Sequence, residues 1–337
     1  MFSPAYLASR VRLCEFAAFI NSFYRTFFIS LVSIMRMDVD PRVSVCQFST
    51  YRWSFYEDVI RYSTLGFDSI GLWRQKIDDF GRSEAIDLLY ENKLSVSSVH
   101  WAGGFTGDGR SFSDSIEDAI ESIQLASQVD ADCLIVHPGS RNGHTTSNAN
   151  RLMKSAFTQL VPVAADYGVQ LAIEPMITRN AASWTYLERL EDSFELIEQF
   201  PAQWVGWVFD LYHFGFDAEL FETLENRIQR LLLVQLSDRN LLLETTAKSR
   251  LGHDSFRLPL GKGEAPIEAW LGKLQGLGYT GKYELEVHGS CVKDLDYFSL
   301  LDDTIDFLET PRIVETFECR PVNSGNDVLQ IDQRQID

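Results

Sequence analysis

The 337-residue chain lacks a long hydrophobic run and lacks an excess of positive charge. Its most apolar stretch, residues 16–35, is broken by Asn21, Ser22 and Arg25, so it matches poorly the roughly 20 apolar residues of a membrane span. Acidic residues number 48 against 30 basic ones, for a formal net charge of −18, whereas nucleic-acid-binding proteins usually present a basic face. We therefore expect neither a membrane nor a nucleic acid as partner, and a small polar substrate fits better.

Cysteine is also scarce, and no two cysteines stand in a CxxC pair. Two of the five lie inside apolar, strand-like runs. The cysteines are Cys14, Cys46, Cys133, Cys291 and Cys319. Isolated, buried cysteines are typical of reduced thiols, so we expect a cytoplasmic protein without disulfides.

The two ends of the chain differ from its middle. Met35 and Met37 directly precede the first strand-like run, which makes this pair a candidate native start and residues 1–36 an N-terminal extension of poorly defined structure. An interfacial amphipathic helix is the alternative for that extension. Residues 311–337 are polar and are expected to form a short C-terminal tail. Residues 37–310 remain as the folded domain.

From residue 43 onward, short apolar or β-branched runs alternate with longer helical patterns, which is typical of βα units and a parallel sheet. Helical periodicity is clear in residues 116–127 and 152–166, and Gly168 is placed to end the second helix. The expected strands are residues 43–48, 69–73, 95–100, 133–137, 170–174, 206–210, 231–235 and 283–287. Eight such units predict an α/β fold, a single (β/α)8 TIM barrel.

Nearly every predicted strand ends in a residue that can bind a metal ion or carry a proton. In a parallel barrel these ends meet at one mouth, where the active sites of this fold lie. We therefore expect the six residues to gather there. They are His100, His137, Glu174, Asp210, Gln235 and Glu286.

Three of these residues are acids, and ionised carboxylates that share one mouth repel each other unless a cation lies between them. Taken singly, an acid at a strand end could instead cap a helix or pair with an arginine. For Glu174, Asp210 and Glu286 together with Gln235, we expect a divalent metal site. Carboxylate and amide oxygens favour Mn²⁺ or Mg²⁺, with Co²⁺ or Zn²⁺ as alternatives.

Other polar residues are candidates for holding the substrate. His213 follows Asp210 by three positions and either contacts the substrate or caps the next helix. Residues 237–264 form the longest stretch without periodicity, and loops of that length are usually functional. Arg257 in this loop is expected to hydrogen-bond a substrate oxygen, although its Gly-rich surroundings could be only a surface turn.

Over roughly residues 43–310, the sequence resembles the sugar phosphate isomerase/epimerase superfamily, which consists of xylose isomerase-like TIM barrels. The ordered combination of short motifs carries the resemblance, and no single motif does. The motifs are Ile135-Val136-His137-Pro138-Gly139, Ile173-Glu174-Pro175, Asp210-Leu211-Tyr212-His213, Val234-Gln235-Leu236-Ser237-Asp238, Arg257 with Pro259-Leu260-Gly261-Lys262-Gly263-Glu264, and Gly278-Tyr279-Thr280-Gly281 before Glu286.

The resemblance implies one metal ion held by Glu174, Asp210, Gln235 and Glu286, with His213 and Arg257 on substrate oxygens. It also allows a homo-oligomer. A metal ion polarises the carbonyl of a hydroxy-carbonyl substrate and stabilises the enediolate that forms when a neighbouring C–H proton is removed. If the two glutamates act on opposite faces the product is an epimer, whereas return of the proton to the adjacent carbon gives an isomer.

Three alternatives to an isomerase or epimerase stay open. A lyase of the inosose dehydratase type would use the same metal and acid–base groups. An endonuclease IV-like repair enzyme would use His100 and His137 as further zinc ligands, but Gln235 and Arg257 replace ligands expected there, and the acidic charge disfavours DNA. If the protein is not such a repair enzyme, we expect His100 and His137 to face the substrate or to pack in the mouth. The third alternative is a non-catalytic sugar-binding barrel.

Overall fold

The computed structural model describes residues 42–107, 109–177, 183–187, 189–240, 257–289 and 292–309. The predicted N-terminal extension (1–36) and C-terminal tail (311–337) lie outside the described residues, as does the middle of the long loop. The division of the chain into these three parts therefore stays a prediction.

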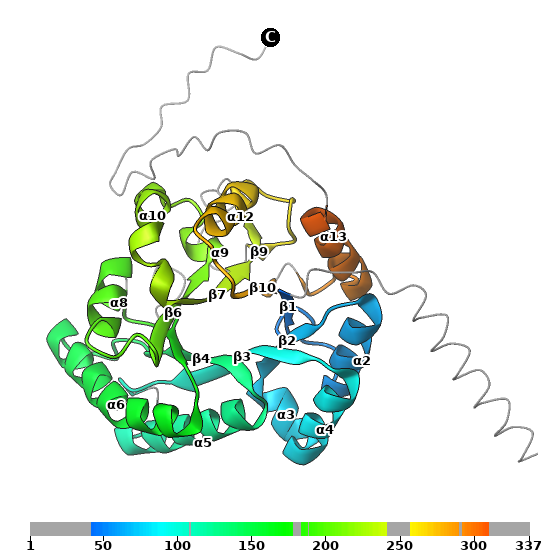
Figure 1. The fold of residues 1–337 in the computed structure, drawn as a ribbon. Helices are drawn as coiled ribbons and strands as arrows, with labels where there is room; N and C mark the ends of the chain where they lie inside the picture. The colour runs from blue at the N-terminus through cyan, green and yellow to red at the C-terminus, as the bar shows by residue number, and fades with distance from the viewer. Residues whose placement is uncertain are drawn as a thin grey trace, which may run out of the picture.

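Eight parallel strands close into a barrel in the order β1-β10-β7-β6-β5-β4-β3-β2, and Figure 1 shows them at the centre of the molecule. Each predicted strand is present, with ends shifted by at most three residues. Their bounds are β1 Val43–Cys46, β2 Ser69–Trp73, β3 Ser95–Gly103, β4 Ala131–His137, β5 Leu171–Ile173, β6 Val205–Asp210, β7 Leu231–Leu236 and β10 Lys282–Leu285. The predicted TIM barrel is confirmed.

Helices surround the barrel as an outer ring (Figure 1). Ser54 and Ser111 begin two of them with capping boxes, and Gly168 ends a third in the left-handed conformation, as predicted. The helices are α2 Phe55–Leu65, α3 Arg74–Phe80, α4 Arg82–Asn92, α5 Phe112–Gln128, α6 Thr146–Tyr167, α8 Leu190–Ile197, α9 Leu211–Phe214, α10 Ala218–Thr223, α12 Ile267–Gly276 and α13 Tyr297–Glu309, with the 3-10 turns η1 Leu224–Asn226 and η2 Ile228–Arg230. None of them has both the length and the apolar character to cross a lipid bilayer.

The loop after β7 returns to the mouth through a small antiparallel pair, β8 (Asp238–Arg239) with β9 (Arg257–Leu258). The Asp238 carboxylate accepts hydrogen bonds from the backbone N–H groups of Gly263 (2.8 Å) and Ala265 (2.9 Å). A Cβ at Gly263 would lie 2.4 Å from that carboxylate, so only glycine fits. This anchorage fixes Arg257 at the mouth.

The barrel interior divides into an apolar and a polar half. Cys133, Ile135, Ala172, Val208 and Leu233 form an apolar cluster of their own, separate from the main core. The polar half contains Ser44, Ser97, Ser98 and Glu284, all with no exposed surface. Cys46 and Cys133 are free and buried, as expected of packed thiols.

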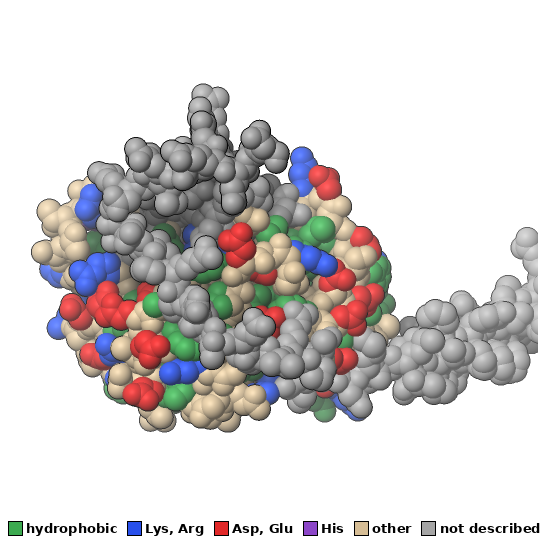
Figure 2. Space-filling view, turned by 90° about the horizontal axis from the view of Figure 1, so that it is seen from above, with side chains coloured by type: hydrophobic (Ala, Val, Ile, Leu, Met, Phe, Trp, Pro, Cys, Tyr) green, Lys and Arg blue, Asp and Glu red, His purple; other side chains and the backbone are tan. Residues whose placement is uncertain are grey.

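Basic and acidic side chains are interspersed over the face drawn in Figure 2. Among the described residues visible there, the lysines and arginines do not gather into one basic patch.

Candidate active site

The four predicted metal ligands come from four neighbouring strands at the carboxyl end of the barrel. Glu174 follows β5, Asp210 ends β6, Gln235 lies in β7, and Glu286 follows β10. Their side chains are buried, with exposed fractions between 0% and 4%. Register places Asp210 beside Gln235 across the β6–β7 pair. The barrel therefore brings together residues that are up to 112 positions apart (174 to 286).

The three acids lie close enough to influence each other. Ligand-type atoms of Glu174, Asp210 and His213 all lie within 4.8 Å of one another. Burial raises the pKa of the Glu286 carboxyl well above its usual value; the Arg257 guanidinium opposes the rise, and the charges of Glu174 and Asp210 add to it. A divalent cation among these groups would relieve that repulsion.

The Gln235 side chain gives the strongest indication that this cluster binds a ligand. Its Nε2 and Oε1 atoms are buried, and neither has a hydrogen-bond partner among the described residues. Leaving a buried polar atom unpaired costs about 1–3 kcal/mol, so an amide in this position calls for a ligand. Oε2 of Glu286 also lacks a hydrogen bond within the described part of the chain. Three carboxylates and an unpartnered amide fit a divalent cation.

Arg257 lines the cavity at the mouth, but its pairing with Asp210 was not predicted from the sequence. Its guanidinium donates to both carboxylate oxygens of Asp210, from Nη2 to Oδ2 (2.6 Å) and from Nη1 to Oδ1 (3.2 Å). It also lies over the ring of Tyr212, 4.6 Å from the centroid. A carboxylate has about four lone-pair positions, so Asp210 can accept this pair and still offer an oxygen to a cation.

His137 and His213 are both held against acids of the cluster. His137 Nε2 lies 2.7 Å from Glu174 Oε2, and its ring stacks on Trp101 at 5.3 Å. His213 Nε2 lies 3.6 Å from Asp210 Oδ2, and its Nδ1 accepts a hydrogen bond from the Ile177 N–H. The alternative of His213 as a helix cap is wrong, because Asp210 caps α9 by accepting from the Tyr212 N–H.

A cavity of about 300 Å³ opens above these groups. Aromatic side chains account for much of its wall, and Trp73 and Trp184 are among them. The lining residues are Phe48, Tyr51, Trp73, His137, Glu174, Met176, Trp184, Arg257, Glu286, His288 and Gly289. Phe48 and His288 could have been found, because each follows a strand end; Trp184 lies in a loop, beyond the reach of strand patterns.

Below the cavity floor lies Glu284, which sequence reasoning missed. Its carboxylate accepts from Ser97 Oγ (2.6 Å), Ser98 Oγ (2.7 Å) and His100 Nε2 (2.9 Å). Burial alone would raise the pKa of Glu284, but the hydrogen bond and charge of His100 outweigh it and lower the pKa.

Burial of the His100 imidazole lowers its pKa. The hydrogen bond to Glu284 and the charge of that carboxylate have the opposite effect, and the pKa of His100 is raised. His100 is not among the residues that line the described cavity, so its predicted contact with substrate stays a prediction.

The barrel fold, with acidic side chains clustered at its mouth, agrees with a known protein family. A family model described as xylose isomerase-like TIM barrel matches residues 60–310, and the chain belongs to that family. An uncharacterised protein of Methanocaldococcus jannaschii, MJ1311, is 27% identical over 177 residues, which are 51% of this chain and 55% of that protein. The chain thus spans about half the length of this curated relative.

Solved structures share the architecture. The IolI protein, in a crystal structure with a zinc atom bound, has a TM-score of 0.67 and 16% identity, over 79% of this chain and 96% of that one. The 3-keto-D-glucoside 4-epimerase YcjR of E. coli has a TM-score of 0.63 and 14% identity, over 80% and 99% of the two chains. At this level of identity, these likenesses show the fold alone.

Proposed function

We propose that the protein is a divalent-metal-dependent isomerase or epimerase of a small, sugar-like hydroxy-carbonyl compound. The observation that carries the proposal is the buried cluster of Glu174, Asp210 and Glu286 around the unpartnered amide of Gln235. Acids gathered at the mouth of a barrel, under a cavity of about 300 Å³, are suited to proton transfer on a bound molecule.

Glu174, Asp210, Gln235 and Glu286 would hold the cation, with Mn²⁺ or Mg²⁺ favoured by their oxygen donors and Co²⁺ or Zn²⁺ as alternatives. When bound, the cation would polarise the substrate carbonyl and stabilise the negative charge that develops beside it. Arg257 orients the Asp210 carboxylate through its two hydrogen bonds.

Glu174 and Glu286 are the proposed proton carriers. Burial raises the pKa of Glu286, which makes its carboxylate a stronger base once it is ionised. His137 holds Oε2 of Glu174 at 2.7 Å and so fixes that carboxylate toward the cavity. If the two acids act on opposite faces of the substrate the product is an epimer; return of the proton to the neighbouring carbon gives an isomer.

The cavity wall suits a sugar-like molecule. Phe48, Trp73 and Trp184 offer aromatic faces for C–H groups of the substrate, while Arg257 and His137 offer polar atoms for its hydroxyl groups. His213 is the proposed second contact to a substrate oxygen. The name of YcjR, an epimerase of keto-glucosides, supports a keto-sugar as the substrate of this chain.

Solvent deuterium exchange tests the proposal. The purified protein is incubated in D2O with Mn²⁺ and a panel of ketoses, hydroxypyruvate and inosose, and products are followed by NMR. We expect deuterium at a carbon next to a carbonyl. Both Glu174→Gln and Glu286→Gln should slow exchange by roughly 10²–10⁴-fold, because each removes a proton carrier. Release of water from the product would instead indicate the lyase alternative.

Glu121→Gln is the matched control, because Glu121 is exposed on α5 and its substitution should leave exchange unchanged. Circular dichroism establishes that each variant is folded. Full exchange in folded Glu174→Gln or Glu286→Gln would contradict the proposed roles.

A further inference from the structure

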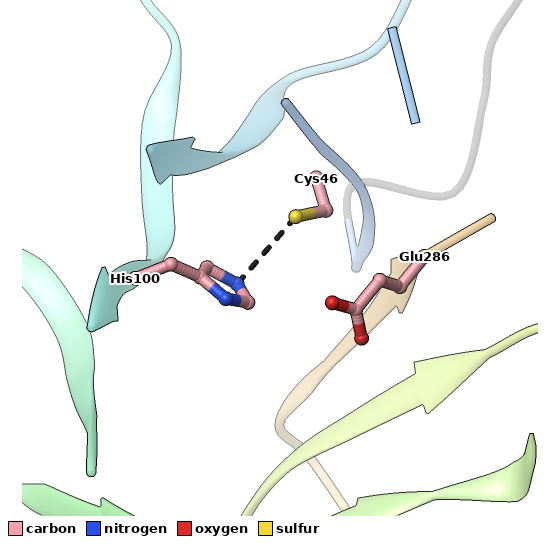
Figure 3. Close-up of side chains that lie close together, drawn as sticks. All are labelled: Cys46, His100 and Glu286. Atoms are coloured by element: carbon pink, nitrogen blue, oxygen red, sulfur yellow. Dashed lines mark hydrogen bonds between the residues drawn. The ribbon is translucent and has the colours of Figure 1, made fainter. Parts of the chain in front are cut away.

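A second group of possible metal ligands lies beside the proposed site, on the polar side of the barrel interior. Cys46 ends β1, His100 lies in β3, and Glu286 follows β10. One ligand atom from each falls within 4.8 Å of the other two, and the three side chains are 0%, 1% and 4% exposed. Figure 3 shows them pointing toward a common space.

The distances suit coordination. Cys46 Sγ lies 3.5 Å from His100 Nε2. In a tetrahedral zinc site, with Zn–S of about 2.3 Å and Zn–N of about 2.0–2.1 Å, a sulfur and a nitrogen ligand are separated by roughly 3.6 Å. The pair therefore already stands at the spacing of two ligands on one ion.

Two buried atoms of this group lack hydrogen bonds. His100 Nδ1 and Glu286 Oε2 have no hydrogen-bond partner within the described part of the chain, and Oε2 lies 3.8 Å from Arg257 Nη1. His100 Nε2 also lies 2.9 Å from Glu284 Oε1, so a cation bound at Nε2 would take the place of this hydrogen bond, while Ser97 and Ser98 still hold the other oxygen of Glu284.

We infer that Cys46, His100 and Glu286 form a second cation site, selective for Zn²⁺ or Co²⁺ over Mn²⁺ and Mg²⁺. Sulfur and imidazole donors favour the former ions, whereas all-oxygen donors favour the latter. Glu286 is also a proposed ligand of the first cation. The second site is nevertheless inferred from the positions of Cys46, His100 and Glu286 alone. On binding, the thiol proton leaves to solvent as the S–metal bond forms, and His100 binds through Nε2 as the neutral imidazole protonated on Nδ1, giving up its hydrogen bond to Glu284.

Cobalt titration of the full-length, chelator-stripped protein tests the site, because a thiolate bound to Co²⁺ gives a charge-transfer band in the near ultraviolet. We expect wild-type protein to take up two equivalents of Co²⁺ or Zn²⁺ and to show this band. Cys46→Ser should lose the band and one equivalent. Cys133→Ser is the matched control: its thiol is also buried but contacts the Ser97 carbonyl, so both signals should remain.

Absence of the band from wild-type protein, or its persistence in folded Cys46→Ser, would overturn the second site. Neither result bears on the first site, which Mn²⁺ binding reports separately. Glu174→Gln should lose Mn²⁺ binding and keep the thiolate–Co²⁺ band. Loss of both signals in that folded variant would also contradict two distinct sites.

Discussion

Single buried side chains that reach across the barrel shape the floor of the mouth. Glu284 on β10 is bonded by two serines of β3, and it fits because Gly71 on β2 has no side chain. A Cβ at Gly71 would lie 2.3 Å from Glu284 Oε2, closer than any normal contact. The carboxylate cannot move aside without giving up its hydrogen bonds in a buried place.

We therefore expect Gly71→Ala to lower the free energy of unfolding by about 1–3 kcal/mol, the usual cost of overpacking a core. Urea denaturation followed by circular dichroism measures it. Gly272→Ala on α12 is the control, because nothing lies within 4 Å of its Cβ position and alanine favours a helix by up to about 1 kcal/mol. Equal stability of the two variants would show that Glu284 is not confined.

The positions of the acids in the mouth could be predicted from the sequence better than those of the residues around them. Glu174, Asp210 and Glu286 were predicted because a strand pattern shows where each strand ends. Glu284 was missed although the two-residue period of a strand puts it on the same face as Glu286. The pair of Arg257 with Asp210 could not be predicted, because it depends on how a long loop returns to the mouth.

Among the elements, the β1–α2 connection is held by the buried, hydrogen-bonded pair of Lys76 and Asp58. Lys76 on α3 donates to Asp58 on α2 (2.7 Å) and to the carbonyl of Thr50 (3.0 Å). Gln47 Nε2 also donates to Asp58. These bonds fix the loop that carries Phe48 into the cavity.

This pair predicts a pH dependence. Burial raises the pKa of Asp58 to about 7, against the opposing charge of Lys76. Between about pH 4 and 7 the unfolded chain has lost this proton while the folded protein keeps it, so Asp58 contributes less stability as pH rises. We expect the free energy of unfolding of wild type, relative to Asp58→Asn, to fall between pH 4.5 and 7.5.

Urea denaturation at both pH values measures the difference, and Asp87→Asn, an exposed position on α4, serves as the control. Parallel changes in wild type and Asp58→Asn would contradict the assignment. A gain in the stability of wild type relative to Asp58→Asn as pH rises would show a pH dependence of the opposite sign.

The elements themselves were largely predictable. Most barrel strands are short runs rich in β-branched or apolar residues, because a barrel strand is buried on both faces. The pair β8–β9 was not predicted, because strands of two residues carry no periodicity. It forms through the hydrogen bonds of Asp238 with distant backbone groups, which depend on the tertiary structure.

At the scale of the whole molecule, closure of the barrel is what creates the site. The register of β6, β7 and β10 aligns Asp210 with Gln235 and Gln235 with Glu284, and Glu286 follows two residues later. No local segment of the chain contains the four proposed ligands. In the proposed site, one cation therefore joins side chains from four strands.

A crystal structure grown with Mn²⁺ tests that claim most directly, through anomalous scattering from the metal. We expect one strong anomalous peak about 2.0–2.3 Å from oxygen atoms of Glu174, Asp210, Gln235 and Glu286, as is usual for such ions. The absence of a peak at saturating Mn²⁺, or a peak that the Gln235 amide does not contact, would contradict it.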